Sequence, residues 1–141
     1  MQMKTMKMAL LSTSNISNDI WKKRSSVFQS FLHNRLVVTV SNAIHLIELD
    51  KITFLSSDSN YCNINLENGQ SILSSKTLKY YELALLDKGF LRIHSGFLIN
   101  LTHLSSISKD EGYQIILNNG ETLPISRSFK AQLFTGRLLK F

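Results

Sequence analysis

Three short segments decide how this sequence is interpreted: Phe54–Tyr61 (FLSSDSNY), Phe90–Asn100 (FLRIHSGFLIN) and Leu123–Phe129 (LPISRSF). Each segment places a few polar side chains next to an apolar run that is typical of a short β-strand. These side chains include hydroxyl, amide, imidazole and guanidinium groups, which donate hydrogen bonds to phosphates and to the edges of bases. None of the three segments carries a set of groups that is typical of catalysis.

The sequence around these segments predicts many short strands. From Leu36 onward the apolar residues follow a period of two, which is typical of β-strands. Asn118-Asn-Gly120 is the strongest hairpin signal. The only proline, Pro124, cannot donate to a strand ladder and predicts that the last strand lies at a sheet edge. The expected strands span residues 36–40, 44–49, 52–55, 61–66, 70–74, 90–93, 97–100, 104–107, 113–117 and 121–125.

The N-terminal part of the chain has a different pattern. Residues 1–18 are rich in Met, Ser and Asn without periodicity, which predicts disorder. From Asp19 to His33 large apolar residues recur at helical spacing, so residues 19–35 are expected to form an amphipathic helical extension with Asn18 or Asp19 as N-cap. The apolar face of this helix leaves two alternatives open, packing on the chain's own domain or self-association.

Two further helices are expected inside the domain. Residues 77–86 have helical spacing that ends at Lys88-Gly89, and the apolar residues between 129 and 138 predict a short closing helix. No repeat and no low-complexity linker divides the rest of the chain. Residues 36–141 are therefore predicted to form one mainly β domain with one or two short helices.

The net charge of +6 is distributed unevenly. Residues 1–35 hold six Lys and Arg against one Asp, a net charge of +5, whereas residues 36–141 hold ten against nine acids, a net charge of +1. Bulk charge therefore favours a nucleic-acid partner only weakly. The better indication is a local basic face at residues 122–141, which hold four basic residues and no acid: Arg127, Lys130, Arg137 and Lys140.

Several functional classes are disfavoured by residue types and spacing. The single cysteine, Cys62, rules out a disulfide framework within the chain and favours a reducing cytosol. No apolar run approaches the roughly 18 residues of a membrane span. The four histidines lack metal-ligand spacing, and no phosphate-binding glycine loop or nucleophile motif occurs. We expect a cytoplasmic protein that is not an enzyme and needs no metal, cofactor or membrane.

The order and spacing of these motifs resemble the LytTR family, the DNA-binding output domain of many bacterial response regulators. The resemblance covers residues 36 to about 138. It rests on Ile52-Thr-Phe54, Asn60-Tyr61, Asn68-Gly69, the predicted helix at 78–85, Phe90-x-Arg92-x-His94, Asn100, Asn119-Gly120 and Pro124-Ile-Ser-Arg127. It implies an elongated arrangement of small antiparallel sheets whose edge loops enter successive major grooves of double-stranded DNA.

The function implied by this resemblance is sequence-specific regulation of transcription in a two-component system. We expect the protein to bind paired direct repeats as a dimer, and the N-terminal helix is the candidate for the homodimer contact. One alternative is a protein-interaction module that binds a partner through an edge strand or the N-terminal helix. Another is an RNA-binding β domain, which the scarcity of aromatics at stacking spacing disfavours.

The resemblance also assigns roles by position. The expected base contacts are Tyr61, Ser95 and Arg127, and the expected backbone-contacting or supporting residues are Asn60, Asn63, Arg92, His94, Gly96, Ser126 and Lys130. The chemistry of Arg127 agrees with its assignment, because a guanidinium donates two hydrogen bonds to O6 and N7 of guanine. Ser95 and Gly96 depart from the family, which often has a basic or amide side chain and then a serine there.

Structural alternatives exist for several of these residues. Arg92 also fits a salt bridge within the sheet, Tyr61 an aromatic residue at the rim, and Arg127 an ion pair at a helix start. For His94 the favoured interpretation is hydrogen bonding to backbone carbonyls that fixes its turn, with direct ligand contact as the alternative.

Overall fold

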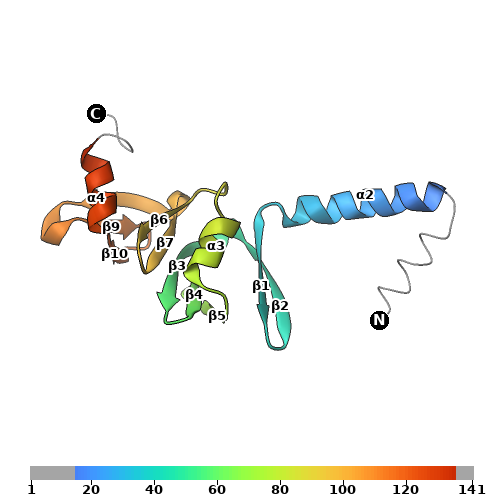
Figure 1. Ribbon diagram of the computed structural model, residues 1–141, viewed down its shortest axis with the longest axis horizontal. Coiled ribbons are helices and arrows are strands. Elements are labelled where there is room, and N and C mark those ends of the chain that lie inside the picture. The colour runs from blue at the N-terminus through green and yellow to red at the C-terminus, as the bar shows by residue number, and fades with distance from the viewer. Residues whose placement is uncertain (1–14, 136–141) are drawn as a thin grey trace.

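Alternating apolar residues form ten strands within residues 15–135, the part of the chain that the computed structural model describes (Figure 1). The strands are β1 (Arg35–Val40), β2 (Ala43–Glu48), β3 (Ile52–Asp58), β4 (Tyr61–Leu66), β5 (Ser71–Ser74), β6 (Phe90–His94), β7 (Phe97–Asn100), β8 (Leu104–Ser108), β9 (Gln114–Leu117) and β10 (Thr122–Pro124). They pair antiparallel in a hairpin β1-β2, a five-stranded sheet of order β5-β4-β3-β7-β6 and a three-stranded sheet of order β10-β9-β8.

Side-chain caps begin the two short helices that accompany these strands. The Oγ1 of Thr77 accepts a hydrogen bond from the backbone N–H of Tyr80 at 3.2 Å, and the Oγ of Ser126 accepts one from Phe129 at 3.1 Å. The α-helices of the described residues are α2 (Asn15–Leu32), α3 (Leu78–Ala84) and α4 (Arg127–Phe134), and the short 3-10 turns are η1 (Leu49–Lys51), η2 (Leu101–His103) and η3 (Asp110–Gly112).

The elements lie along one long axis. Figure 1 shows α2 extending away at one end, the hairpin β1-β2 next to it, the five-stranded sheet in the middle, and the three-stranded sheet with α4 at the other end. The predicted fold, a mainly β and elongated arrangement of small antiparallel sheets with two short helices and an N-terminal helix, is confirmed.

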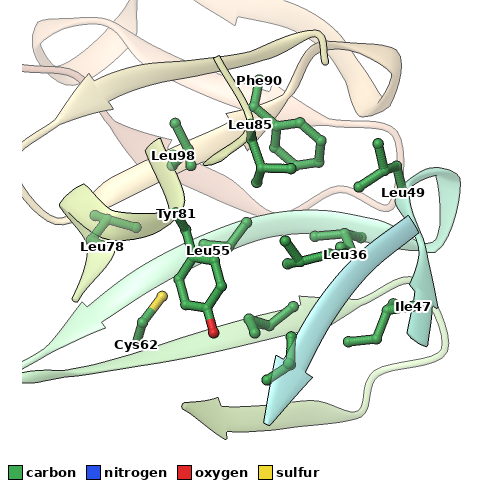
Figure 2. Packing of buried hydrophobic residues seen from close by; sticks show 13 residues of the cluster. Leu36, Ile47, Leu49, Leu55, Cys62, Leu78, Tyr81, Leu85, Phe90 and Leu98 are labelled. Carbon is green, nitrogen blue, oxygen red and sulfur yellow. The ribbon is translucent and has the colours of Figure 1, made fainter. Parts of the chain in front are cut away.

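The five-stranded sheet is buried on both faces. Leu55 and Leu98 belong to a core shared with the hairpin and α3, and Figure 2 shows Leu55 packed there with Tyr81 and Leu36. The neighbouring residues Phe54 and Ile99 belong to a second core shared with the three-stranded sheet and α4. Because side chains alternate between the faces of a strand, neighbouring residues of β3 and β7 enter different cores. The irregularity between Ile52 and Phe54 places Ile52 in the same core as Leu55. The sheet is thereby held firmly, and so are the turns at its ends.

The start of α2 corrects the prediction for the N-terminal region. The helix begins at Asn15, so residues 15–18 are helical rather than disordered, and Asn18 and Asp19 lie inside the helix instead of capping it. No glycine or proline interrupts residues 15–32, and Asn and Ser cost only about 0.7 kcal/mol or less each in a helix interior. A helix that has formed therefore extends through them. The rest of the predicted disordered segment, residues 1–14, lies outside the described residues.

The apolar side of α2 does not pack on the domain. Its large apolar side chains are exposed to solvent, with exposed fractions from 41% to 70%: Ile20, Trp21, Val27, Phe28 and Phe31. Of the two alternatives that the sequence left open, packing on the chain's own domain is the wrong one. None of the helices within residues 15–135 is long and apolar enough to cross a membrane.

The predictions of a hairpin and of an edge strand are both confirmed in the three-stranded sheet. Asn118-Asn-Gly120 connects β9 to β10, and Gly120 has the positive φ of 88° that this tight hairpin requires. Pro124 lies in β10, an edge strand of the three-stranded sheet. The prediction from proline chemistry is therefore confirmed.

Candidate DNA interface

The β6-β7 turn carries Ser95 and is fixed by its own side chains. The Nδ1 of His94 accepts a hydrogen bond from the backbone N–H of Gly96 at 3.0 Å. The ring is thereby held as the tautomer with hydrogen on Nε2. His94 fixes its turn as expected, but its partner is a backbone N–H rather than a carbonyl.

Gly96 lies where a side chain would crowd the neighbouring strand. A Cβ at this position would lie 3.3 Å from the Oγ of Ser57, which is closer than such atoms normally approach. The backbone N–H of Ser57 donates to the carbonyl of Gly96 at 3.0 Å. Glycine at 96 therefore allows the turn to sit against the end of β3.

Arg92 holds the same turn from its other side. Its Nε donates to the carbonyl of His94 at 2.8 Å and its Nη2 to the carbonyl of Ser95 at 2.5 Å. Its Nη1 forms a salt bridge with Oε1 of Glu82 on α3 at 2.9 Å. Arg92 thus forms a salt bridge, but with a residue of α3 rather than within the sheet, where the structural alternative placed it. The guanidinium has five N–H donors, so two remain for another partner.

The N-terminus of α4 meets this turn. The backbone N–H of Ser126 donates to the carbonyl of Ile93 at 2.8 Å, which ties the start of α4 to the end of β6. Ser95 and Ser126 line a shared groove of about 420 Å³. Serine hydroxyl groups and the imidazole of His94 thus line one hollow together with Arg92 and Glu82, and hydroxyl and imidazole groups can donate hydrogen bonds to acceptor oxygens.

The side chain of Arg127 is exposed between two residues that line this groove, Ser126 and Ser128, but does not line it itself. It is the first residue of α4, is exposed, and forms no salt bridge with any residue of the described range. The ion pair considered for Arg127 is therefore not seen there. Lys130 lies one turn further along α4, with its Nζ 4.6 Å from the ring centroid of Tyr113. The remaining residues of the predicted basic face, Arg137 and Lys140, lie outside the described residues.

A second turn, between β3 and β4, carries Asn60 and Tyr61. Ser59 has a φ of 57°, which sharpens this two-residue hairpin between the paired residues Asp58 and Tyr61. Both Asn60 and Tyr61 are exposed. Asn63 lies two residues further on the same face of β4 as Tyr61 and is half-buried.

The two turns occupy the same end of the five-stranded sheet. β3 pairs with β4 on one side and with β7 on the other, and Ser57 at the end of β3 binds Gly96. Tyr61, however, lines a separate groove of about 520 Å³ with Val40 and Leu73. The structure therefore gathers most predicted residues into one cluster, Arg92, His94, Ser95, Gly96, Ser126 and Arg127, and places Asn60 and Tyr61 in the neighbouring turn.

Sequence reasoning missed several members of this surface. Glu82, Ser128 and Gln132 line the groove, and Ser57 supports the turn. Nothing local indicates Glu82, because its partner Arg92 lies ten residues away on another element. Ser128 had a local signal, since it follows Arg127 in the first turn of the predicted closing helix.

The acid that lines the groove, Glu82, is paired with Arg92, and the only cysteine of the chain, Cys62, is buried. Within residues 15–135 no three His, Cys, Asp or Glu side chains come together as a metal site. Burial raises the pKa of the Cys62 thiol to about 11, which keeps it neutral. The arrangement supplies hydrogen-bond donors and positive charge, which suit a binding surface.

Comparisons with known proteins agree with this geometry. The family model of the LytTr DNA-binding domain matches residues 42–136. The LytTr DNA-binding domain of a Bacillus cereus protein has the same fold, with a TM-score of 0.63 at 22% identity over 77% of this chain and 98% of that one.

Curated relatives are about 30% identical to this chain within the aligned region. The sensory transduction protein LytR of Staphylococcus haemolyticus is 30% identical over 96 residues, 67% of this chain and 37% of that protein. The transcriptional regulatory protein BtsR of Salmonella typhi is 31% identical over 97 residues, 67% of this chain and 39% of that protein. The chain thus spans about two fifths of the length of these relatives. With well over half of its residues matched by the family model, the chain belongs to the LytTR family of DNA-binding domains.

Proposed function

We propose that this chain binds double-stranded DNA in a sequence-specific manner, as the DNA-binding part of a bacterial transcription regulator of the two-component type. One observation carries the proposal: the end of β6, directly before the Ser95 turn, is tied to the start of α4, where Arg127 is exposed and forms no salt bridge with any described residue. Family membership and the names of the regulators in the comparisons support it. We place the protein in the cytoplasm, where its DNA would be.

Base contacts are assigned to Arg127, Ser95 and Tyr61, which enter major grooves from the two turns and the helix start. Arg127 reads guanine through two parallel hydrogen bonds, whereas serine and tyrosine each contribute one contact. Because the two turns share one sheet end, they reach neighbouring parts of the duplex. A few base contacts held in a fixed geometry are enough for a modest sequence preference.

Phosphate contacts fix the register of the protein on DNA. Ser126 and the N-terminal N–H groups of α4 can bind an anion such as a phosphate, and Lys130 adds a positive charge one turn away. Asn60 and Asn63 support the Tyr61 turn. Arg92 chiefly positions the Ser95 turn through its two carbonyl contacts, and its remaining donors contact a phosphate.

We further propose that two copies act together on paired direct repeats and that self-association uses α2. The support for the second statement is the exposed apolar face of that helix. The same face would also serve a protein-interaction module without DNA binding, which is the alternative function. Salt-dependent binding of duplex DNA distinguishes the two.

The test is selection of bound sequences from a random pool of duplexes, followed by affinity measurements at several salt concentrations. We expect a recurring sequence, and for about four phosphate contacts a slope of log affinity against log salt near −3.6, at roughly −0.9 for each phosphate. Recovery of unenriched sequences, or a slope near zero, would contradict specific DNA binding and favour the protein-interaction module.

A further inference from the structure

The helix α2 is held firmly at one end although nothing in the described chain covers its apolar face. The Nη1 of Arg35 donates to the carbonyl of Phe31 at 2.7 Å, and the Nζ of Lys88 donates to the carbonyl of His33 at 2.9 Å. The guanidinium of Arg35 also lies 3.8 Å from the ring centroid of Phe31. These contacts satisfy carbonyls at the C-terminal end of the helix and fix its direction. The helix is therefore anchored at its C-terminal end, with its apolar face exposed.

Six large side chains of that face are spaced symmetrically along the helix. Within an arc of about 120° at 100° per residue lie Ile20, Trp21, Arg24, Phe28, Phe31 and Leu32. The arc also includes the position of the small residue Ser17, and the exposed Val27 flanks it at about 20° outside. The six successive positions are separated by one, three, four, three and one residues, so this pattern of intervals is the same in both directions from position 26. A surface with this property is complementary to a copy of itself that has been turned end over end.

We propose that α2 pairs antiparallel with α2 of a second copy, around a two-fold axis that passes between the two helices at the level of residue 26 along their length. In this register Trp21 lies opposite the partner's Phe31, and Ile20 lies opposite the partner's Leu32. At both ends of the face, apolar side chains of one copy therefore lie against apolar side chains of the other. This arrangement specifies the self-association proposed above and rests on it.

The charged residues of α2 favour the antiparallel direction. Arg24 is the only charged residue in the middle of the apolar face, and the register places it against the ring of the partner's Phe28, where a cation-π contact forms. Phe28 already stacks on Phe31, with ring centroids 6.1 Å apart. A parallel pair would instead align Lys22, Lys23 and Arg24 with the same three residues of the partner. The antiparallel pair separates the two Lys23 positions by about 9 Å along the axis, at 1.5 Å per residue.

The exposed area is sufficient for such a pair. The five exposed large apolar side chains on this side of α2, Ile20, Trp21, Val27, Phe28 and Phe31, are about half exposed, and each leaves on the order of 100 Å² to be covered. Two copies would then bury roughly 1,000 Å² in total, which is the lower limit for a specific interface. The pair is therefore expected to form reversibly at micromolar or higher concentration rather than as a permanent dimer.

The symmetry of the helix pair differs from that of direct repeats. A two-fold axis orients the two DNA-binding surfaces in opposite directions, whereas direct repeats are related by a translation along the duplex. A pair occupying both direct repeats would have to bend at residues 33–35. The helix pair is therefore tested without DNA, so that its failure leaves the DNA-binding proposal unaffected.

Mixed disulfide formation tests the register in the full-length protein. Ile20→Cys and Leu32→Cys are prepared separately, and Cys62 does not compete because its side chain is fully buried. After mixing and mild oxidation, we expect the disulfide between the Ile20→Cys chain and the Leu32→Cys chain to exceed both disulfides between identical chains. Predominant disulfide formation between two Ile20→Cys chains indicates a parallel pair and overturns the proposal. Crosslinking that is no more frequent than expected from chance collisions of monomers overturns it as well.

Sedimentation equilibrium of uncrosslinked protein provides the independent measurement. Phe28→Ser should weaken dimerisation about tenfold or more, as expected for a central contact made twice in a symmetric pair. Leu83→Ser is the matched control, because Leu83 on α3 is 62% exposed and Phe28 is 55% exposed. Equal dimerisation of wild type and Phe28→Ser, or equal weakening by Leu83→Ser, overturns the assignment to α2.

Discussion

The two amphipathic helices α2 and α4 lie at opposite ends of the molecule and have opposite relations to it (Figure 1). In α4, Phe129 and Leu133 are buried in the core shared with the three-stranded sheet. In α2, Phe28 and Phe31 are exposed, and the helix is held only through polar contacts at its end. An amphipathic sequence thus indicates which face of a helix is apolar, but the rest of the chain determines whether that face is covered within the same molecule.

The largest expected effect of this difference is on stability. Phe129→Ala should destabilise the domain by about 3–5 kcal/mol, because it removes a buried ring and leaves a cavity. Phe28→Ala should change the stability of the dilute, monomeric protein by less than about 0.5 kcal/mol, since its ring is exposed. Urea unfolding at low protein concentration measures both. If Phe28→Ala costs as much as Phe129→Ala, α2 packs on the domain and the comparison fails.

At the α4 end, the polar start of the helix should determine sequence preference. Arg127→Ala is expected to cost about 1–3 kcal/mol on the preferred duplex, with the loss concentrated at one guanine. Lys130→Ala should weaken all duplexes about equally, because a phosphate contact carries no sequence information. Both variants are compared on specific and non-specific duplexes at one salt concentration. If Arg127→Ala lowers both affinities by the same factor, Arg127 contacts only phosphate.

Glu82 links α3 to the DNA-binding end through Arg92. Glu82→Gln replaces a charged hydrogen bond by a neutral one, so the Ser95 turn should be held less firmly and specific binding should lose about 1 kcal/mol. Non-specific binding should increase slightly, because one negative charge near the duplex is removed. Fluorescence anisotropy with specific and random duplexes gives both affinities. Equal increases for the two duplexes would mean that Glu82 acts by charge alone.

The attachment of α2 should have the smallest effect on the domain. Lys88→Met removes the hydrogen bond to the carbonyl of His33 and a positive charge at the C-terminal end of the helix, worth about 0.3–1 kcal/mol. Hydrogen exchange of residues 15–32 should become faster, whereas exchange in β3 and β7 should not change. Lys79→Met serves as the control, because Lys79 is an exposed lysine on α3. Faster exchange in β3 after Lys88→Met would show that α2 and the domain unfold together.

Local signals in the sequence predicted most of the fold. The period of two placed the strands, Asn118-Asn-Gly120 placed a hairpin, and Pro124 identified an edge, because each depends on the chemistry of neighbouring residues. The start of α2 was predicted too late, since Asn and Ser before Asp19 are tolerated inside a helix. Helix boundaries depend on small differences in propensity and are correspondingly hard to place.

The candidate site was predictable as a set of positions but not as a geometry. Spacing within the family indicated Ser95, Ser126 and Arg127. The structure brings Ser95 and Ser126 together in one groove and leaves Arg127 exposed as the residue after Ser126. The contacts of Arg92 with Glu82 and with the carbonyls of the turn depend on how α3 packs beside β6. Such contacts between distant elements follow from tertiary packing, which no local pattern encodes.

Sequence-specific binding of duplex DNA is the central claim, and the ratio of two affinities tests it most directly. The full-length chain is titrated at one physiological salt concentration against a duplex recovered by selection and against the same duplex with its bases scrambled. We predict that the selected duplex binds at least about 10³-fold more tightly, the lower limit for specific DNA-binding proteins. Equal affinity for the two duplexes would contradict the account.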